Sequence, residues 1–154
     1  MKRMFFFLAL VPVFLWSMFA AVVLAEDSQK QSQDVIWMGT EAVLHREVNG
    51  DCLIMSGNID TGGTTEGDRL LLGREVNLAG VTGEDARLVG VVVNDSGIVK
   101  GNVSAIGQRI NIDRDAYLNG NLHCIGGYVD IKGHIEGNVQ VLGGTVVISG
   151  DIGG

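Results

Sequence analysis

The sequence predicts an all-β protein: a single-stranded, right-handed parallel β-helix (solenoid) of about seven coils with about 17 residues each. Two observations lead to this prediction. A repeat runs from about Asp34 to the last residue, and within each copy aliphatic residues alternate with polar ones. The composition agrees, because 23 Gly with 1 Pro and no three-residue period exclude collagen-like and Pro-rich disordered chains.

The repeat is defined by an anchor position that is glycine in every copy but one. Neighbouring anchors are 17 residues apart except for one interval of 19, which holds two extra residues near Asp113 to Ala116. The residue five positions before each anchor is always Asp or Asn. The anchors are Gly39, Ser56, Gly73, Gly90, Gly107, Gly126 and Gly143, and the Asp/Asn row is Asp34, Asp51, Asp68, Asp85, Asn102, Asn121 and Asn138.

Five further positions of the repeat are apolar in nearly every copy. They lie four and two residues before the anchor and three, five and, in most copies, nine residues after it. Their spacing and their Val/Ile content predict two or three strands of four or five residues per copy, each with one buried face. Stacked about 4.8 Å apart, seven coils make a rod about 30 Å long with a continuous interior. Glycine and Asp/Asn are expected at the corners, with the Asp/Asn side chains bonding their own backbone.

Two other solenoids fit the pattern less well. The left-handed hexapeptide β-helix needs an inward aliphatic residue every six positions, whereas the inward gaps here are 2, 5, 2, 4 and 4. The calcium-binding nonapeptide β-roll needs a Gly-Gly-x-Gly-x-Asp period of nine, which is missing from this sequence.

Two charged residues interrupt the inward positions, Arg69 and Asp95. A buried unpaired charge costs several kcal/mol, so either the two residues pair, or the strand bulges locally and turns them outward. We favour the bulge. Thr61, Thr65 and Thr82 are the remaining polar exceptions.

The chain divides into three parts. Residues 1–25 carry Lys2 and Arg3, then an apolar run that ends in Val23-Leu24-Ala25, which is typical of a secretory signal peptide or, if uncleaved, of a membrane anchor. Residues 26–33 form a polar spacer, and residues 34–154 form the β-helix domain. Both interpretations of the first part export the rest of the chain to the periplasmic or extracellular side of the cytoplasmic membrane.

The charge of the chain restricts its partners. Its net charge is −7, or −9 without Lys2 and Arg3, which argues against nucleic acid and against an anionic membrane surface. Membrane contact is therefore expected only through residues 1–25.

The repeat unit also carries a family resemblance. The segment from Glu136 to Gly150, EGNVQVLGGTVVISG, resembles the bactofilin or polymer-forming cytoskeletal family, in particular its exported members with a signal peptide. The resemblance covers residues 34–154. It implies a right-handed β-helix that polymerises end to end into non-polar filaments without nucleotide and serves as an envelope or cell-shape scaffold. Typical bactofilins are cytosolic, and Arg69 and Asp95 depart from the pattern.

The residues that could carry chemistry have structural interpretations. Cys52 and Cys124 lie in the second and sixth coils, about 19 Å apart, so they are predicted to be buried free thiols rather than a disulfide. His45, His123 and His134 are predicted to be solvated. The Asp row could bind a divalent cation, although turn capping is the simpler interpretation. No catalytic, cofactor or metal residue is assigned, and an acyltransferase or carbohydrate-active enzyme is the least favoured hypothesis.

The favoured function is a scaffold that associates with copies of itself. The sequence stops before an eighth coil, so we expect the last coil to expose strand edges and aliphatic residues, while Trp37, Met38 and the spacer fold over the first coil. Two copies are therefore expected to meet through their last coils, tail to tail. The alternative is a monomeric exported module that binds a wall polymer or an envelope protein. The predicted assembly residues are Val139, Val141, Val146, Ile148 and Ile152.

Overall fold

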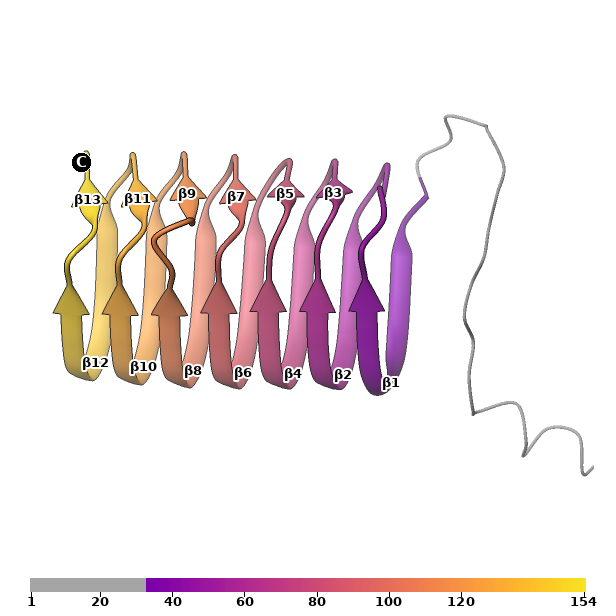
Figure 1. Ribbon diagram of the computed structural model, residues 1–154, viewed down its shortest axis with the longest axis horizontal. Coiled ribbons are helices and arrows are strands. Elements are labelled where there is room, and N and C mark those ends of the chain that lie inside the picture. The colour runs from indigo at the N-terminus through magenta and orange to yellow at the C-terminus, as the bar shows by residue number, and fades with distance from the viewer. Residues whose placement is uncertain (1–32) are drawn as a thin grey trace, which may run out of the picture.

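A computed structural model describes residues 33–154, and these residues form one parallel β-solenoid of about seven coils (Figure 1). Each coil contributes one strand of ten residues, and six of the coils add a strand of two residues. The long strands are β1 (Val35–Leu44), β2 (Cys52–Thr61), β4 (Arg69–Leu78), β6 (Ala86–Asp95), β8 (Val103–Ile112), β10 (Leu122–Ile131) and β12 (Val139–Ile148). The short strands are β3 (Thr64–Thr65), β5 (Val81–Thr82), β7 (Ile98–Val99), β9 (Tyr117–Leu118), β11 (His134–Ile135) and β13 (Asp151–Ile152).

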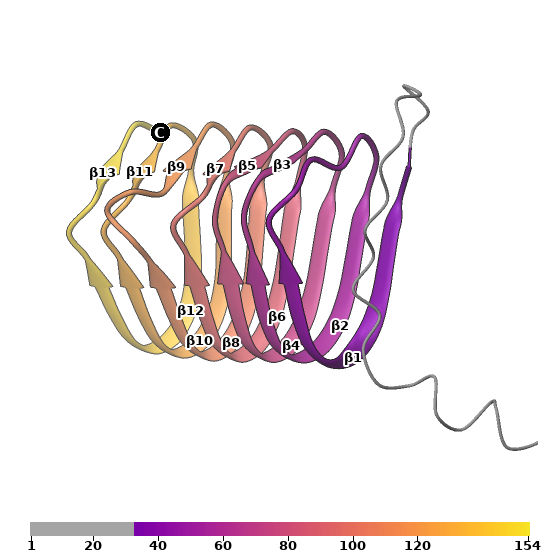
Figure 2. The same cartoon turned by 45° about the vertical axis from the view of Figure 1, so that its right-hand side comes forward.

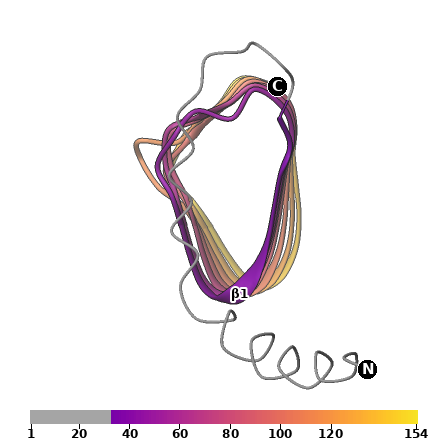
Figure 3. The same ribbon diagram turned by 90° about the vertical axis from the view of Figure 1, so that its right-hand side faces the viewer.

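The strands form two parallel sheets that run the length of the solenoid. The long strands pair in the order β1-β2-β4-β6-β8-β10-β12, and the short strands pair from β3 to β13 (Figure 2). Seen from its N-terminal end, the chain winds clockwise as it recedes, which makes the helix right-handed (Figure 3). The predicted fold class is confirmed. Within residues 33–154 there is no helix long and apolar enough to span a membrane, and residues 1–32 lie outside the described part.

The pairing register is the one that the repeat predicts. Gly107 pairs with Gly126, Gly126 pairs with Gly143, and the two inserted residues form an outward bulge between β8 and β9 without shifting this register (Figure 3). Because every coil keeps the same register, the five inward positions stack into one core. Val76, Val93, Ile110 and Val129, for example, are wholly buried in successive coils.

One detail of the strand prediction is wrong. The two short strands expected on either side of the anchor are a single ten-residue strand that bends there (Figure 3). The anchor glycine allows this bend because neighbouring coils approach closely at that point. A Cβ at Gly107 would lie 2.7 Å from the carbonyl oxygen of Gly90, closer than any side chain tolerates. Left-handed glycines are instead found at another corner, at Gly63 and Gly80.

The Asp/Asn row makes a hydrogen-bond ladder between coils, which corrects the expectation that each side chain bonds its own backbone. The side-chain Oδ1 of every row member except Asn138 accepts a hydrogen bond from the backbone N–H of the equivalent residue in the next coil, as in Asp51 to Asp34 (3.0 Å) and Asn138 to Asn121 (2.9 Å). The amides of Asn102, Asn121 and Asn138 add a second bond to the preceding side chain. The row therefore stabilises the stacking of coils rather than single turns.

The expected bulge at Arg69 and Asp95 is also wrong, because both side chains are fully buried in unbroken strands. Arg69 is accommodated by acceptors that line the interior. Its Nε donates to Thr65 Oγ1 (2.7 Å), and its two terminal nitrogens donate to the carbonyl oxygens of Ala79 (2.8 Å), Val81 (3.1 Å) and Gly63 (3.3 Å). These acceptors satisfy a charge that would otherwise oppose folding.

Substitutions in β10 test the register. Val129→Asp places a carboxylate in the core, where it finds no partner, and we expect the free energy of unfolding to fall by several kcal/mol. His123→Ala, on the outward side of the same strand, should change it by no more than about 0.5 kcal/mol. Urea unfolding of both variants measures the difference, and equal losses would contradict the inward assignment.

Candidate assembly surfaces at the ends of the solenoid

The C-terminal coil is open on one side. Within residues 33–154, β12 pairs only with β10 and β13 only with β11, so one edge of each strand has no neighbouring strand there. The five predicted assembly residues lie together on this coil. Val146 and Ile148 are 40% and 49% exposed, whereas Val129 and Ile131, the same positions one coil earlier, are wholly buried. Val139, Val141 and Ile152 are partly buried against the core. These residues are exposed because, within residues 33–154, no further coil stacks on this side.

The N-terminal coil is better covered. Ala42, Leu44 and Val48 are at most 8% exposed. The indole of Trp37 lies against the anchor glycine, since a Cβ at Gly39 would be 3.1 Å from Trp37 Nε1. A hollow of about 650 Å³ remains at this mouth, lined mainly by aliphatic residues of β1 and by Ile54.

Met38 does not help to cover the first coil. It is 71% exposed and points outward from the side of the solenoid, because it occupies the position before the anchor, where every coil turns its side chain out. The spacer residues 26–32 lie outside the described part. Of the expected cover, the structure shows only Trp37 in place.

The cysteines are buried as predicted. Cys52 on β2 and Cys124 on β10 are both free and 1% exposed, with β4, β6 and β8 between their strands. Burial raises the pKa of both thiols, that of Cys124 to about 12. Because the thiolate is the reactive form, both side chains behave as small core residues.

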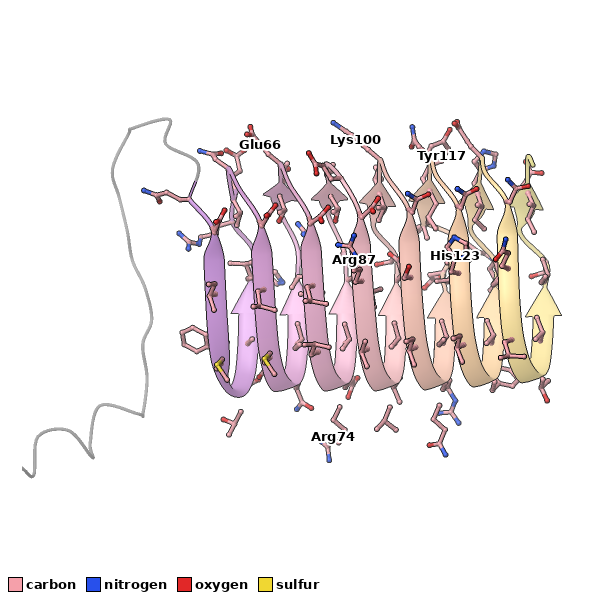
Figure 4. The ribbon with its side chains drawn as sticks, turned by 180° about the vertical axis from the view of Figure 1, so that it is seen from behind. Glu66, Arg74, Arg87, Lys100, Tyr117 and His123 are labelled. Atoms are coloured by element: carbon pink, nitrogen blue, oxygen red, sulfur yellow. The ribbon has the colours of Figure 1, made fainter. Side chains whose placement is uncertain are left out.

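The histidines lie on the surface, each in different surroundings. His123 on β10 is exposed on the face that Figure 4 turns toward the viewer. His45 Nε2 lies 3.4 Å from Asp60 Oδ2, and His134 Nδ1 lies 3.2 Å from Asp151 Oδ2 while its ring stacks on Tyr117. Among residues 33–154, no three His, Cys, Asp or Glu side chains are arranged to hold a metal ion. Arg87 bridges two members of the Asp row, Asp68 (2.8 Å) and Asp85 (3.3 Å) (Figure 4).

The sequence analysis missed a row of outward aliphatic residues. The residue immediately before the anchor is apolar in every coil and points away from the core. The sequence could have revealed this row, because the 17-residue repeat aligns the outward positions of the coils as well as the inward ones. The row consists of Met38, Met55, Leu72, Val89, Ile106, Ile125 and Leu142.

The fold defines a class of protein, the parallel β-solenoid, and within residues 33–154 the last coil has an unpaired strand edge. Comparison of the chain with family models, with curated proteins and with solved structures finds no match.

Asp95 carries a carboxyl group that is buried in the core, and its surroundings change its pKa. Its Oδ1 accepts a hydrogen bond from the N–H of Gly97 (2.9 Å), and its Oδ2 has no hydrogen-bond partner within the described residues. Burial raises the pKa of this carboxyl to about 7, against opposing effects of the Gly97 hydrogen bond and of the Arg69 charge. In the unfolded chain the carboxyl ionises near pH 3.8, so between pH 4 and 7 the unfolded state releases a proton that the folded state keeps.

We therefore expect Asp95 to lower stability as the pH rises. The loss develops between about pH 4 and pH 7 and amounts to about 4 kcal/mol above that range. Asp95→Asn cannot ionise, so its free energy of unfolding relative to wild type should rise by that amount from pH 4 to pH 8. Urea unfolding across this range measures it.

Asp68→Asn is the matched control with the opposite sign. The hydrogen bond from Arg87 lowers the pKa of Asp68, so its carboxylate stabilises the fold at neutral pH and loses that effect in acid. A parallel pH dependence of the two variants would contradict the burial of Asp95.

Proposed function

We propose that the chain is a non-enzymatic structural scaffold that associates end to end through stacked coils, and that it acts outside the cytoplasmic membrane in a bacterial cell envelope. The proposal rests on the exposed strand edge and exposed aliphatic side chains of the C-terminal coil. A free ten-residue strand edge and half-exposed Val146 and Ile148 together offer unpaired backbone groups and aliphatic side chains to a second chain. The resemblance to exported bactofilins and the apolar run in residues 1–25 supply the proposed location.

The spacing of inward residues in β12 favours tail-to-tail contact. The inward positions Val139, Val141, Val146 and Ile148 are symmetric about the midpoint between Gly143 and Gly144. If two copies pair their β12 strands antiparallel about that midpoint, Val139 lies opposite Ile148 of the second copy and Val141 lies opposite its Val146. Every inward residue then meets an inward residue, and the free edges of both strands are satisfied.

The N-terminal end favours the same arrangement. Head-to-tail growth would place β1 on β12, with Trp37 stacked on Val141 and the hollow of the first coil between the two copies. Two C-terminal coils present no bulky aromatic residue to each other, since β12 and β13 contain none. The contact also needs no nucleotide, because it extends hydrogen bonds and aliphatic rows that each rod already contains.

The main test places a charge on the open coil. Ile148→Lys should abolish end-to-end assembly of the purified chain, because a buried ammonium costs several kcal/mol in the stacked state. Its cost in the single chain is small, since Ile148 is half exposed there. Sedimentation velocity and negative-stain microscopy at micromolar concentration measure the assembly. Tyr128→Lys adds the same charge at an exposed site one coil earlier and should leave assembly intact.

A wild-type chain that shows no end-to-end assembly under these conditions would refute the scaffold. The binding-module hypothesis would then be preferred.

Cross-linking tests the direction of stacking. In the antiparallel pairing, Leu142 lies opposite Thr145 of the second copy, at a Cα separation of about 5 Å that suits a disulfide. A Leu142→Cys/Thr145→Cys variant should therefore form covalent dimers on mild oxidation. A Glu41→Cys/Thr145→Cys variant, with the two cysteines at equivalent positions of the first and last coils, reports head-to-tail stacking instead and should not cross-link. The reverse result would retain the scaffold but contradict tail-to-tail contact.

A further inference from the structure

The side of the solenoid carries an apolar surface that neither the core nor the open end explains. It lies on the first half of each long strand, where outward residues stand three and one positions before the anchor (Figure 4). Met38 and Leu142 are each 71% exposed, and Ile106 and Ile125 about half exposed. We call this surface the outer apolar face. It comprises Ile36, Met38, Leu53, Met55, Leu70, Leu72, Val89, Ile106, Ile125 and Leu142.

The face is flat, continuous and as long as the rod. Seven strands about 4.8 Å apart and four residues of about 3.3 Å each give an area of about 400 Å². Arg87 is the one charged side chain on it, and its guanidinium is held at the rim by Asp68 and Asp85. An exposed apolar patch of this size on a folded domain is often a functional contact surface.

We propose that the outer apolar face binds the same face of a second copy, so that two rods lie side by side. The area of the outer apolar face is consistent with a second rod as its partner. A stable interface buries about 800 Å² per partner, with an apolar centre and a polar rim. The face supplies the centre, and the Asp/Asn row along one border and the strand bend along the other supply the rim. A rod of equal length covers the whole face, whereas a short peptide would leave most of it exposed.

The distribution of charge supports a second copy and fixes its direction. One rim carries Asp34, Asp51, Asp68 and Asp85 in its first half, and these would repel an anionic lipid or polymer. The opposite rim, one residue past the anchor, has no acidic residue and carries Arg74 (Figure 4). If the two rods run parallel about a two-fold axis along their length, the acidic rim of each faces the acid-free rim of the other. Arg74 and Asp68 belong to the same coil and come to the same level.

The apolar residues favour the same direction. In the first three coils both outward positions are aliphatic. In the later coils the position three residues before the anchor is polar or charged, and it holds Arg87, Ser104, His123 and Gln140. Parallel rods place the most apolar coils against each other. Antiparallel rods would place Ile36 and Leu53 against Gln140 and His123.

The test uses a chain whose ends cannot stack. In the Ile148→Lys background, sedimentation velocity at tens of micromolar should show a pair of rods rather than a single one. Adding Ile106→Lys, a charge at the centre of the face, should weaken this pair at least tenfold. Adding Gln108→Lys, the same charge at an exposed position on the bend, should not. Circular dichroism confirms that all variants fold.

Three results would overturn the proposal: an Ile148→Lys chain that is monomeric throughout, a pair that Ile106→Lys leaves intact, or a monomer that floats with phosphatidylcholine vesicles in an Ile106-dependent way. The last would assign the face to lipid. This test does not depend on end-to-end assembly, so the two proposals fail separately.

A distance measurement tests the direction of the pair. A spin label at Gln140→Cys lies in the last coil, so in parallel rods the two labels share one level and should be less than about 20 Å apart. In antiparallel rods the label would lie opposite the first coil of the partner, about six strand spacings or 29 Å from the other label. The longer distance would contradict parallel pairing.

Discussion

The hydrogen bonds between backbone groups of consecutive coils, made at one register, are the interaction on which the rest of the structure depends. They place each residue beside its equivalent in the next coil, so that side-chain rows become continuous along the solenoid. The Asp/Asn ladder follows from this stacking, and so does a second ladder in which the amides of Asn94 and Asn111 donate to Asn77 and Asn94. The two-residue insertion before β9 is tolerated because it lies outside the paired segments. A shift of one residue would instead turn the aliphatic rows outward.

Much of this architecture could be predicted from the sequence, because the same pattern at a nearly constant spacing in seven copies identifies which positions stack. The inward rows, the insertion and the burial of Cys52 and Cys124 follow from that spacing alone. The environment of Arg69 could not be predicted, since it depends on carbonyl groups of Ala79 and Val81 whose direction only the corner geometry determines. The backbone geometry at a corner also decides whether a coil has two short strands or one strand that bends at a glycine, and sequence periodicity does not distinguish these two cases. The outer apolar face was predictable, but only by applying the register to outward positions.

The same regularity leaves two surfaces of the solenoid incompletely satisfied. Within residues 33–154 no strand pairs with the outer edge of β12, and Val146 and Ile148 lack the cover that Val129 and Ile131 have. A repeat with an aliphatic residue at an outward position produces an apolar row as long as the rod. The proposed end-to-end and side-by-side contacts would satisfy these two surfaces independently. The core differs from both, since its charged side chains, Arg69 and Asp95, are enclosed within one chain.

Amide hydrogen exchange of β12 in the wild-type protein is the most direct test of the central claim that stacking continues from one chain to the next. Alternate amides of β12 face away from β10 and have no acceptor among the residues that the structure describes. At concentrations where the protein assembles, these amides should be protected to the level found in the interior strand β8, and the protection should disappear on dilution. Rapid exchange of these amides in assembled protein, at the rate of a free strand edge, would show that the coils do not stack between chains.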